Sequence, residues 1–404
     1  MISVEEARVR LLRPLEPLTP EQVSLADAFG RVLAEAVTAR RTQPPTALSA
    51  MDGYAVAAED VVEVPARLKV VGAVPAGRSH DQRVGRGEAV RIFTGAPLPA
   101  GTDAIVIQED TERDGDVVVV KEGAPKGRYV RPAGLDFVEG SVGVPAGRRL
   151  TARDIGLAAA MDRPWLMVHR RPRVAILATG DEIVMPGDPI GPNQIVSSNS
   201  IALGAFVAAC GGVPLQLGIA ADKPEAVRQA AEGARGADLL VTTGGASVGE
   251  HDLVKDALGV SGLELDFWKI AMRPGKPLMV GRFRDAVMVG LPGNPVSALV
   301  CALIFLKPAI ERLSGLDPIA EPPVTARLAT PLAQNDRRQD YLRATLARAA
   351  DGDLVATPFP KQDSSMISLL ARSDCLVVRP PLAPAAAAGE RVVILPLGGG
   401  LLAL

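Results

Sequence analysis

Charged side chains gather in a few glycine- and proline-rich loops, each placed directly after a predicted strand. The stretch from Val241 to Asp252, VTTGGASVGEHD, leaves an apolar strand through Gly244 and Gly245, passes Ser247 and ends in acids before a helical pattern. Glycines let a ligand come close to the backbone, and the free N–H groups of a first helical turn favour an anion. Because the loop also carries carboxylates, we interpret it as a site for a phosphate together with a divalent metal.

Three acids follow three different predicted strands: Glu182, Asp222 and Asp252. The carboxyl ends of parallel strands share one edge of a sheet, so these side chains are expected to converge on one crevice. Carboxylates that lie close together repel one another unless they share a cation or protons. Magnesium, held by carboxylates and substrate phosphates, meets that need. Each acid could instead cap the helix that follows, an alternative that is strongest for Asp222.

The stretch KIAMRPGKP carries three cations within eight residues: Lys269, Arg273 and Lys276. Its prolines and glycine are expected to hold these charges rigidly for an oxyanion or a phosphoanhydride, although an ordinary charged turn is the alternative. The stretch LPGNP at 291–295 leads into a helix N-terminus, a second position suited to an anion.

Several function classes are excluded by what the sequence lacks. It contains no Walker A sequence and no GxGxxG, and its three histidines lack a zinc-binding spacing. A net charge of −2 and an aromatic content of 3% argue against a nucleic-acid partner. The longest apolar run, at 298–306, is far shorter than the ~20 residues that span a bilayer. Without a secretory signal or paired cysteines, the chain is expected to be cytoplasmic, with no membrane partner and no disulfide framework.

The elements that must position these loops alternate between strand and helix from Pro172 to about Leu316. Strands are predicted at 174–178, 213–219, 238–242, 265–270, 278–280 and 286–289. Helices are predicted from 199 or 200 to about 210, at 224–234 and at 296–313. This alternation predicts a mostly parallel sheet with helices on both of its faces.

The flanking regions have a different pattern. Helices are predicted from Ser3 to about residue 13, at 25–28 and at 151–161. Short strands at 68–71, 89–93, 104–108 and 117–121 lie between repeated Pro-Ala-Gly turns and indicate a β-rich insertion. The last 85 residues or so carry five more predicted strands, which indicate a small β-barrel or sandwich: 324–329, 341–347, 354–357, 375–378 and 391–395.

Six stretches of the chain together resemble one family, the molybdopterin molybdotransferases of MoeA type, which also occur as the C-terminal part of gephyrin. They are SAMDGYAV at 49–56, RIFTGAPLP at 91–99, TGDE at 179–182, TTGGASVGEHD at 242–252, KIAMRPGKP at 269–277 and GLPGNPVSA at 290–298. Their order and approximate spacing match over essentially the whole chain, which is far more specific than any single stretch.

The resemblance implies an elongated, multidomain subunit of α/β and β type. Its expected parts are a central three-layer α/β molybdopterin-binding domain, a β-rich insertion domain, a small helical linking domain and a C-terminal β-barrel. The ranges that correspond, in that order, are 1–20 with 172–318, 40–140, 21–39 with 141–171, and 319–404.

The resemblance also implies an activity in molybdenum cofactor biosynthesis. The expected enzyme uses magnesium to insert molybdate into adenylylated molybdopterin and releases AMP and molybdenum cofactor. A homodimer is expected, with each site shared between the insertion domain of one subunit and the α/β and C-terminal domains of the other. Molybdopterin adenylyltransferase and molybdoenzyme delivery proteins are candidate partners.

Site residues follow from the resemblance position by position. The residues expected to be catalytic are Asp52, Asp136, Glu182, Asp222, Asp252 and Lys269. The residues expected to bind substrate are Thr94, Arg131, Gly244, Gly245, Ser247, Arg273, Lys276, Pro292, Pro295, Arg343 and Ser364. The expected metal ligands are Glu182, Asp222 and Asp252.

Two positions depart from the family pattern. Arg273 stands where lysine is frequent; the charge is kept, but an arginine fork recognises oxyanions differently. Leu48 stands where many members have asparagine, which removes a polar contact. Two other functions stay open: an adenylyltransferase activity of the α/β domain, against which the extra domains speak, and a non-catalytic scaffold, against which the retained acids and cations speak.

Overall fold

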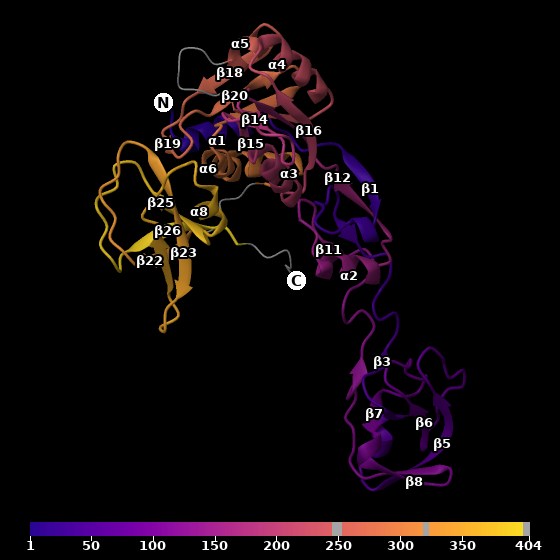
Figure 1. Ribbon diagram of the computed structural model, residues 1–404. Helices are drawn as coiled ribbons and strands as arrows, with labels where there is room; N and C mark the ends of the chain where they lie inside the picture. Colours follow the sequence, from indigo (N-terminus) through magenta and orange to yellow (C-terminus); the bar gives the residue numbers. More distant parts are fainter. Residues whose placement is uncertain (245–252, 318–322, 399–404) are drawn as a thin grey trace.

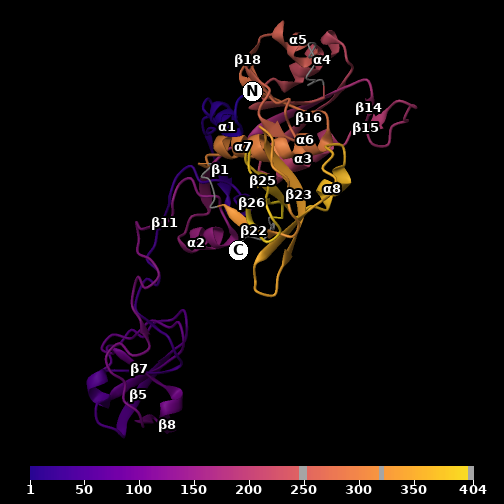
Figure 2. The same ribbon diagram turned by 90° about the vertical axis from the view of Figure 1, so that its left-hand side faces the viewer.

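The computed structural model describes residues 1–244, 253–317 and 323–398 of the 404-residue chain. An α/β domain and a β-barrel form the body of the molecule, and a small linking domain joins this body to a β-rich arm (Figure 1). The arm stands away from the body in a perpendicular view as well (Figure 2). The predicted elongated subunit of α/β and β type is therefore confirmed.

A six-stranded sheet forms the centre of the α/β domain. Its order is β16 (Val213–Ala220), β13 (Arg173–Thr179), β17 (Leu239–Thr243), β21 (Ala286–Leu291), β20 (Met279–Phe283) and β18 (Leu263–Trp268). The first four strands are parallel, and β20 pairs antiparallel with both β21 and β18, so β20 alone runs against the other five. The central strands β13 and β17 are almost entirely buried, as continuous apolar runs covered on both faces should be. The mostly parallel sheet was predicted correctly.

Helices cover both faces of this sheet, which makes three layers. One face carries α1 (Val4–Leu12), α3 (Asn199–Ala209) and a long helix composed of α6 (Pro295–Cys301), a π segment (Ala302–Leu306) and α7 (Lys307–Leu313). The other face carries α4 (Pro224–Ala231) and α5 (Leu253–Gly259). The Ser3 hydroxyl accepts the Glu6 backbone N–H and so caps α1 as predicted. None of the helices in the described part of the chain is long and apolar enough to cross a membrane.

The linking domain is built from pairs of short strands and one helix. Strand β1 (Pro20–Ser24) pairs with β12 (Trp165–His169), and β2 (Val37–Thr38) pairs with β11 (Val142–Val144). Helix α2 (Ala152–Ala160) begins with a capping box made by Thr151 and Asp154.

The helix predicted at 25–28 is wrong. Leu25–Asp27 form a single 3-10 turn that follows β1. The turn ends at its C-cap Ala28, and Gly30 follows with a φ of +73°. Too few residues remain there to compensate for the cost of starting an α-helix.

The arm contains a six-stranded sheet in the order β7 (Ala104–Ile107), β4 (Gly53–Val56), β6 (Glu88–Ile92), β5 (Ala66–Val74), β9 (Val117–Val120) and β8 (Thr111–Asp114). Strand β4 was not predicted, although it lies inside the SAMDGYAV stretch. A Cβ on Gly53 would lie 2.0 Å from the Val106 carbonyl oxygen, so only glycine lets β4 enter the sheet beside β7. Strand β3 (Leu48–Ser49) pairs with β10 (Val130–Arg131) where the arm begins.

The C-terminal part is a closed barrel, which decides between the predicted barrel and sandwich. Its strands are β23 (Gln339–Arg348), β24 (Leu354–Pro358), β22 (Val324–Leu328), β26 (Arg391–Pro396) and β25 (Cys375–Arg379), and β25 pairs with β23 to close the ring. Helix α8 (Ile367–Ala371) precedes β25. Strand β19 (Met272–Arg273) belongs to the KIAMRPGKP stretch and extends the barrel by parallel pairing with β23.

Candidate functional site

Three loops that follow parallel strands lie against one another at one edge of the α/β sheet. Gly244, after β17, has a φ of +92°, and a Cβ there would lie 2.2 Å from the Thr179 carbonyl oxygen at the end of β13. The Asn199 side-chain amide donates to Thr243 Oγ1 at 2.8 Å and to the Gly293 carbonyl at 2.7 Å. The sequence placed Asn199 only at the start of a predicted helix, and its role in tying these loops together follows from the tertiary register rather than from any sequence motif.

Two of the predicted acids lie on neighbouring loops of this edge. The Asp222 backbone N–H donates to Asp181 Oδ1 at 3.0 Å, so the loops after β16 and β13 are joined. The Glu182 carboxylate folds back over Gly180, where a Cβ would lie 2.5 Å from Glu182 Oε2. Asp222 does not cap α4, because the N-cap position is Lys223 and no side chain makes a capping hydrogen bond there. The capping alternative for Asp222 is therefore wrong.

Glu182 and Asp222 fit a hard cation by the chemistry of their donors. Both carboxylates are exposed, and neither makes an ion pair with a basic residue in the described ranges. The described residues contain no complete group of three His, Cys, Asp or Glu side chains that could hold a metal. The third predicted ligand, Asp252, lies outside the described residues together with Gly245 and Ser247. The magnesium site therefore stays a prediction.

The three cations of KIAMRPGKP have different surroundings. Arg273 contacts the carboxylates of Asp340 and Asp336, the latter at 3.3 Å, and so ties β19 to the barrel. Burial raises the pKa of Asp340, an effect that the Arg273 guanidinium opposes. Lys269 and Lys276, in contrast, make no ion pair within the part of the chain that the structure describes. An incoming anion would meet uncompensated charge at these two lysines but not at Arg273.

A loop of the barrel reaches the LPGNP stretch that contains Pro292 and Pro295. The Asn294 side-chain amide donates to Ser364 Oγ at 2.9 Å, and the Val296 backbone N–H donates to the Ser364 carbonyl at 3.1 Å. Ser364 therefore lies at the start of α6, beside the loops of the sheet edge. Asn294 was not predicted as a site residue; its position at a helix N-cap after a strand was the available signal.

Arg343 lies beneath this barrel loop and is only 1% exposed. Its guanidinium donates to Gln362 Oε1 at 3.2 Å and to the Met366 carbonyl at 3.2 Å. Its Nη2 is buried and has no hydrogen-bond partner among the described residues. Burial lowers the pKa of Arg343. No carboxylate in the described ranges forms an ion pair with Arg343, but the Asp363 carboxylate, next to Ser364, opposes the fall in its pKa and so offsets part of its charge.

The remaining predicted residues lie in the arm and at its base. The Asp52 carboxylate accepts the Thr94 backbone N–H at 2.7 Å and the Thr94 hydroxyl at 2.8 Å. These two hydrogen bonds, the first most strongly, lower the pKa of Asp52. Arg131 pairs with Leu48 between β10 and β3, and Asp136 lies nearby with its backbone N–H bonded to the Gln43 carbonyl at 3.0 Å.

The structure does not bring these arm residues together with the sheet edge of the same chain. The linking domain separates β3 and the strands of the arm from the α/β domain and the barrel (Figures 1 and 2). The predicted residues therefore form two groups. One contains Asp52, Thr94, Arg131 and Asp136, and the other contains Glu182, Asp222, Gly244, Lys269, Lys276, Pro292, Pro295, Arg343 and Ser364, with Arg273 at its border.

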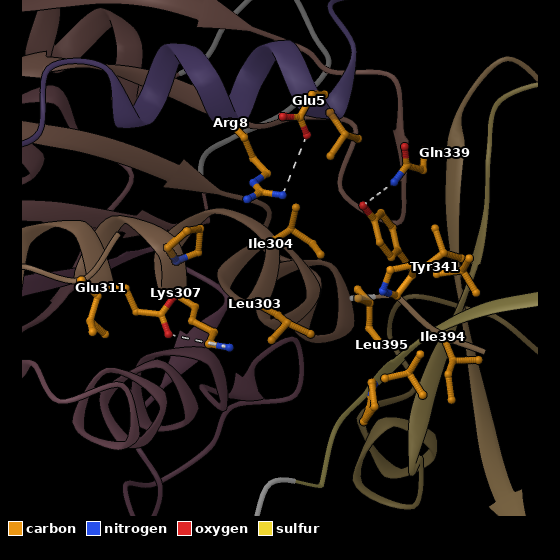
Figure 3. Close-up of a pocket in the computed structure, with 18 of the residues that line it drawn as sticks. Glu5, Arg8, Leu303, Ile304, Lys307, Glu311, Gln339, Tyr341, Ile394 and Leu395 are labelled. Atoms are coloured by element: carbon orange, nitrogen blue, oxygen red, sulfur yellow. Dashed lines mark hydrogen bonds and ion pairs between the residues drawn. The ribbon is translucent and has the colours of Figure 1, made fainter. Parts of the chain in front are cut away.

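A cavity of about 690 Å³ opens elsewhere, between α1, the α6–α7 helix and the barrel (Figure 3). Leu303, Ile304 and Leu395 contribute apolar walls, and Tyr341 accepts a hydrogen bond from Gln339 at 2.7 Å. None of the predicted site residues lines this cavity. The candidate site is therefore the loop edge of the sheet and not this hollow.

Comparisons with known proteins agree along the chain. Residues 2–161 match the MoeA N-terminal region (domains I and II), residues 175–312 a probable molybdopterin binding domain, and residues 325–397 the MoeA C-terminal region (domain IV). The chain is 39% identical to a molybdopterin molybdenumtransferase of Nostoc sp. over 81% of its own length and 77% of the relative. It is 33% identical to that of Haemophilus influenzae over 98% of each.

A solved structure shows the same arrangement of domains. The molybdopterin biosynthesis MoeA protein of Pyrococcus horikoshii superimposes with a TM-score of 0.86 at 30% identity, covering 99% of this chain and all of that one. The match in sequence and in structure thus extends over the arm, the α/β domain and the barrel alike. The chain belongs to the molybdopterin molybdenumtransferase (MoeA) family, whose members are enzymes of molybdenum cofactor biosynthesis.

Proposed function

We propose that this enzyme inserts molybdate into adenylylated molybdopterin in a magnesium-dependent reaction and releases AMP and molybdenum cofactor. One observation carries the proposal: uncompensated acids and uncompensated cations lie on loops at the same edge of one sheet, the acids after β13 and β16 and the cations between β18 and β20. Glu182 and Asp222 supply the acids, and Lys269 and Lys276 supply cations on the described surface. A substrate that combines a phosphoanhydride with a separate oxyanion needs both kinds of group.

The residues of this edge have separate tasks in the proposed reaction. Glu182 and Asp222, with Asp252, would hold magnesium, which would neutralise phosphate charge at the adenylate when bound. Lys269 and Lys276 would bind molybdate and phosphate oxygens. Since no described acid compensates the charge of these cations, they can stabilise charge that develops as the phosphoanhydride is cleaved by water.

Ser364 and Arg343 would act from the barrel. Ser364 is already fixed to the start of α6 through Asn294 and can present its hydroxyl to the anion. The buried guanidinium of Arg343 would favour a negative charge above it. Both contributions depend on the contact between the barrel and the α/β domain.

We also propose that the enzyme is a homodimer in which each site takes its arm residues from the partner. The linking domain lies between the arm, which carries Asp52 and Asp136, and the α/β domain, which carries Glu182, so a single chain does not bring these parts together (Figures 1 and 2). Exposed apolar side chains flank both halves of the site: Leu135, 59% exposed, is next to Asp136, and Ile195, 61% exposed, is bonded through its backbone N–H to the Glu182 carbonyl. Val138, 53% exposed, and Val196, 49% exposed, follow them in sequence, so each half of the site exposes more than a single apolar side chain, as a surface that another protein covers does.

The test is a direct assay on the purified protein with adenylylated molybdopterin, molybdate and magnesium. Molybdate-dependent release of AMP, with formation of molybdenum cofactor, is expected. Glu182→Gln should abolish the release, whereas Glu63→Gln, at an exposed acid of the arm, should leave it unchanged. Absence of AMP with the wild-type protein would refute the proposal. Adenylylation of molybdopterin from ATP would instead favour adenylyltransferase activity.

A further inference from the structure

An aromatic side chain lies beneath one of the uncompensated lysines. Trp268 ends β18, where it pairs with Met279 of β20. Lys269 follows with a φ of +77°, a backbone conformation that residues with side chains rarely adopt. From there its side chain reaches back over the indole, and Lys269 Nζ lies 4.2 Å from the ring centre. This is well within the distance at which an aromatic face attracts a cation.

The indole is fixed by its own surroundings. Trp268 packs against the hydrophobic cluster beneath α4 and α5. A second ammonium group, that of Lys255 in α5, lies 5.3 Å from the centre of the same ring. The ring is therefore held by apolar contacts on the body of the domain while it attracts ammonium groups from two different elements.

This way of holding a lysine differs from the way in which the same loop holds its arginine. Asp336 and Asp340 fix Arg273 and cancel its charge. An aromatic ring fixes an ammonium through its quadrupole and leaves the net charge of the ammonium unchanged. Lys269 can therefore be ordered and still carry a full positive charge for an incoming anion.

We propose that Trp268 is a positioning residue that holds the Lys269 ammonium, without neutralising it, for a tetrahedral oxyanion of the molybdate class. This inference rests on the proposed function, since it takes molybdate to be the anion that Lys269 receives. The indole acts through Lys269 and does not itself contact the anion.

The first test measures molybdate binding by equilibrium dialysis of the full chain at fixed ionic strength. Trp268→Leu removes the aromatic face and is expected to weaken binding about fivefold, while Trp268→Phe keeps a smaller quadrupole and should recover part of that loss. Trp165→Phe is the matched control at an exposed tryptophan of the linking domain, and it should bind as wild type does. In the product assay the KM for molybdate should rise while kcat at saturating molybdate stays near the wild-type value.

A double-mutant cycle separates positioning from a general structural role. If Trp268 acts through Lys269, Trp268→Leu should have no further effect on molybdate affinity once Lys269→Met is present. Wild-type affinity in Trp268→Leu would overturn the inference, and so would a loss that persists undiminished in the Lys269→Met background. If Trp268→Leu fails to fold, Trp268→Phe decides: about a twofold loss that disappears with Lys269→Met supports the role, and no loss overturns it.

The same measurements distinguish failure of this inference from failure of the proposed function. If the wild-type enzyme forms molybdenum cofactor and Trp268→Leu does so with an unchanged KM for molybdate, only the role of Trp268 is refuted. If the wild-type enzyme releases no AMP, the proposed function is refuted, and molybdate dialysis still decides whether Trp268 supports an anion at Lys269.

Discussion

The division of the site between two chains makes a quantitative prediction for mixed dimers. Asp52→Ala damages the half of the site on the arm, and Glu182→Ala damages the half on the α/β domain. Each variant alone has a defect in both sites of its dimer and should be inactive. In a heterodimer of the two, one site has both defects, whereas the other combines an intact arm with an intact α/β domain.

The expected activity follows from counting sites. Random association of the two variants makes about half of the dimers heterodimers, and half of the sites in these are intact, so the mixture should reach about a quarter of wild-type activity. Refolding or coexpression of differently tagged chains, followed by measurement of AMP release per chain, tests this value. A site contained within one chain would give no recovery at all.

A matched control uses the double variant Asp52→Ala, Glu182→Ala mixed with wild-type chains. With shared sites, both sites of such a heterodimer have one defect, so only wild-type homodimers work and activity falls to about a quarter. With sites contained in one chain, every wild-type chain keeps its site and activity is about half. An activity of half in this control, together with no recovery in the first mixture, would refute the shared geometry.

Three further outcomes are expected. Gly244→Ala should lower the free energy of unfolding by about 2–4 kcal/mol in urea titrations, because its Cβ would meet the Thr179 carbonyl and its φ is positive. The control is Gly236→Ala, at a glycine that has a positive φ but open space around it, and it should lower the free energy of unfolding by only about 1 kcal/mol. Equal losses in the two variants would contradict this reasoning. Hydrogen bonds from Arg338 lower the pKa of Asp336 to about 2. The contribution of the Asp336 carboxylate to stability is therefore complete above its unfolded pKa near 4 and is lost as the pH falls through about 2. The difference in urea midpoint between wild type and Asp336→Asn should shrink between about pH 5 and about pH 2, and a constant difference would refute the assignment. Removal of magnesium with EDTA should stop AMP release while molybdate dialysis still shows binding, and unchanged AMP release without any divalent metal would argue against the metal role.

Much of the fold could be predicted because its signals are local. Strands β13, β17 and β21 are apolar runs between turn residues, and the structure places their ends within a residue or two of the predicted positions. Strand β4 was missed because its entry into the sheet depends on how closely Val106 approaches Gly53, which no local pattern records. The turn at Leu25–Asp27 was mistaken for a helix because its residues suit a helix while its length does not.

The sequence predicted which residues belong to the site, but it did not predict which of their charges are compensated by neighbouring side chains. The motifs identify Arg273 and Lys269 equally well as cations of one loop. Only the tertiary structure shows that Asp336 and Asp340, more than sixty residues further along the chain, compensate Arg273 and not Lys269. The burial of Arg343 is likewise a product of barrel closure, since its neighbours in sequence are those of an ordinary strand.

The packing of α1 has a consequence for the synthesis of the chain. The apolar side of α1, with Val4, Ala7 and Leu11, belongs to the same cluster as α7, and the Arg312 side chain donates to the Leu15 carbonyl across 297 positions of sequence. At a translation rate of about 5–20 residues per second, α1 waits about 15–60 s for its partner helix to be made. During that interval its apolar side is open to chaperones, and the α/β domain can close only after the arm has already emerged from the ribosome.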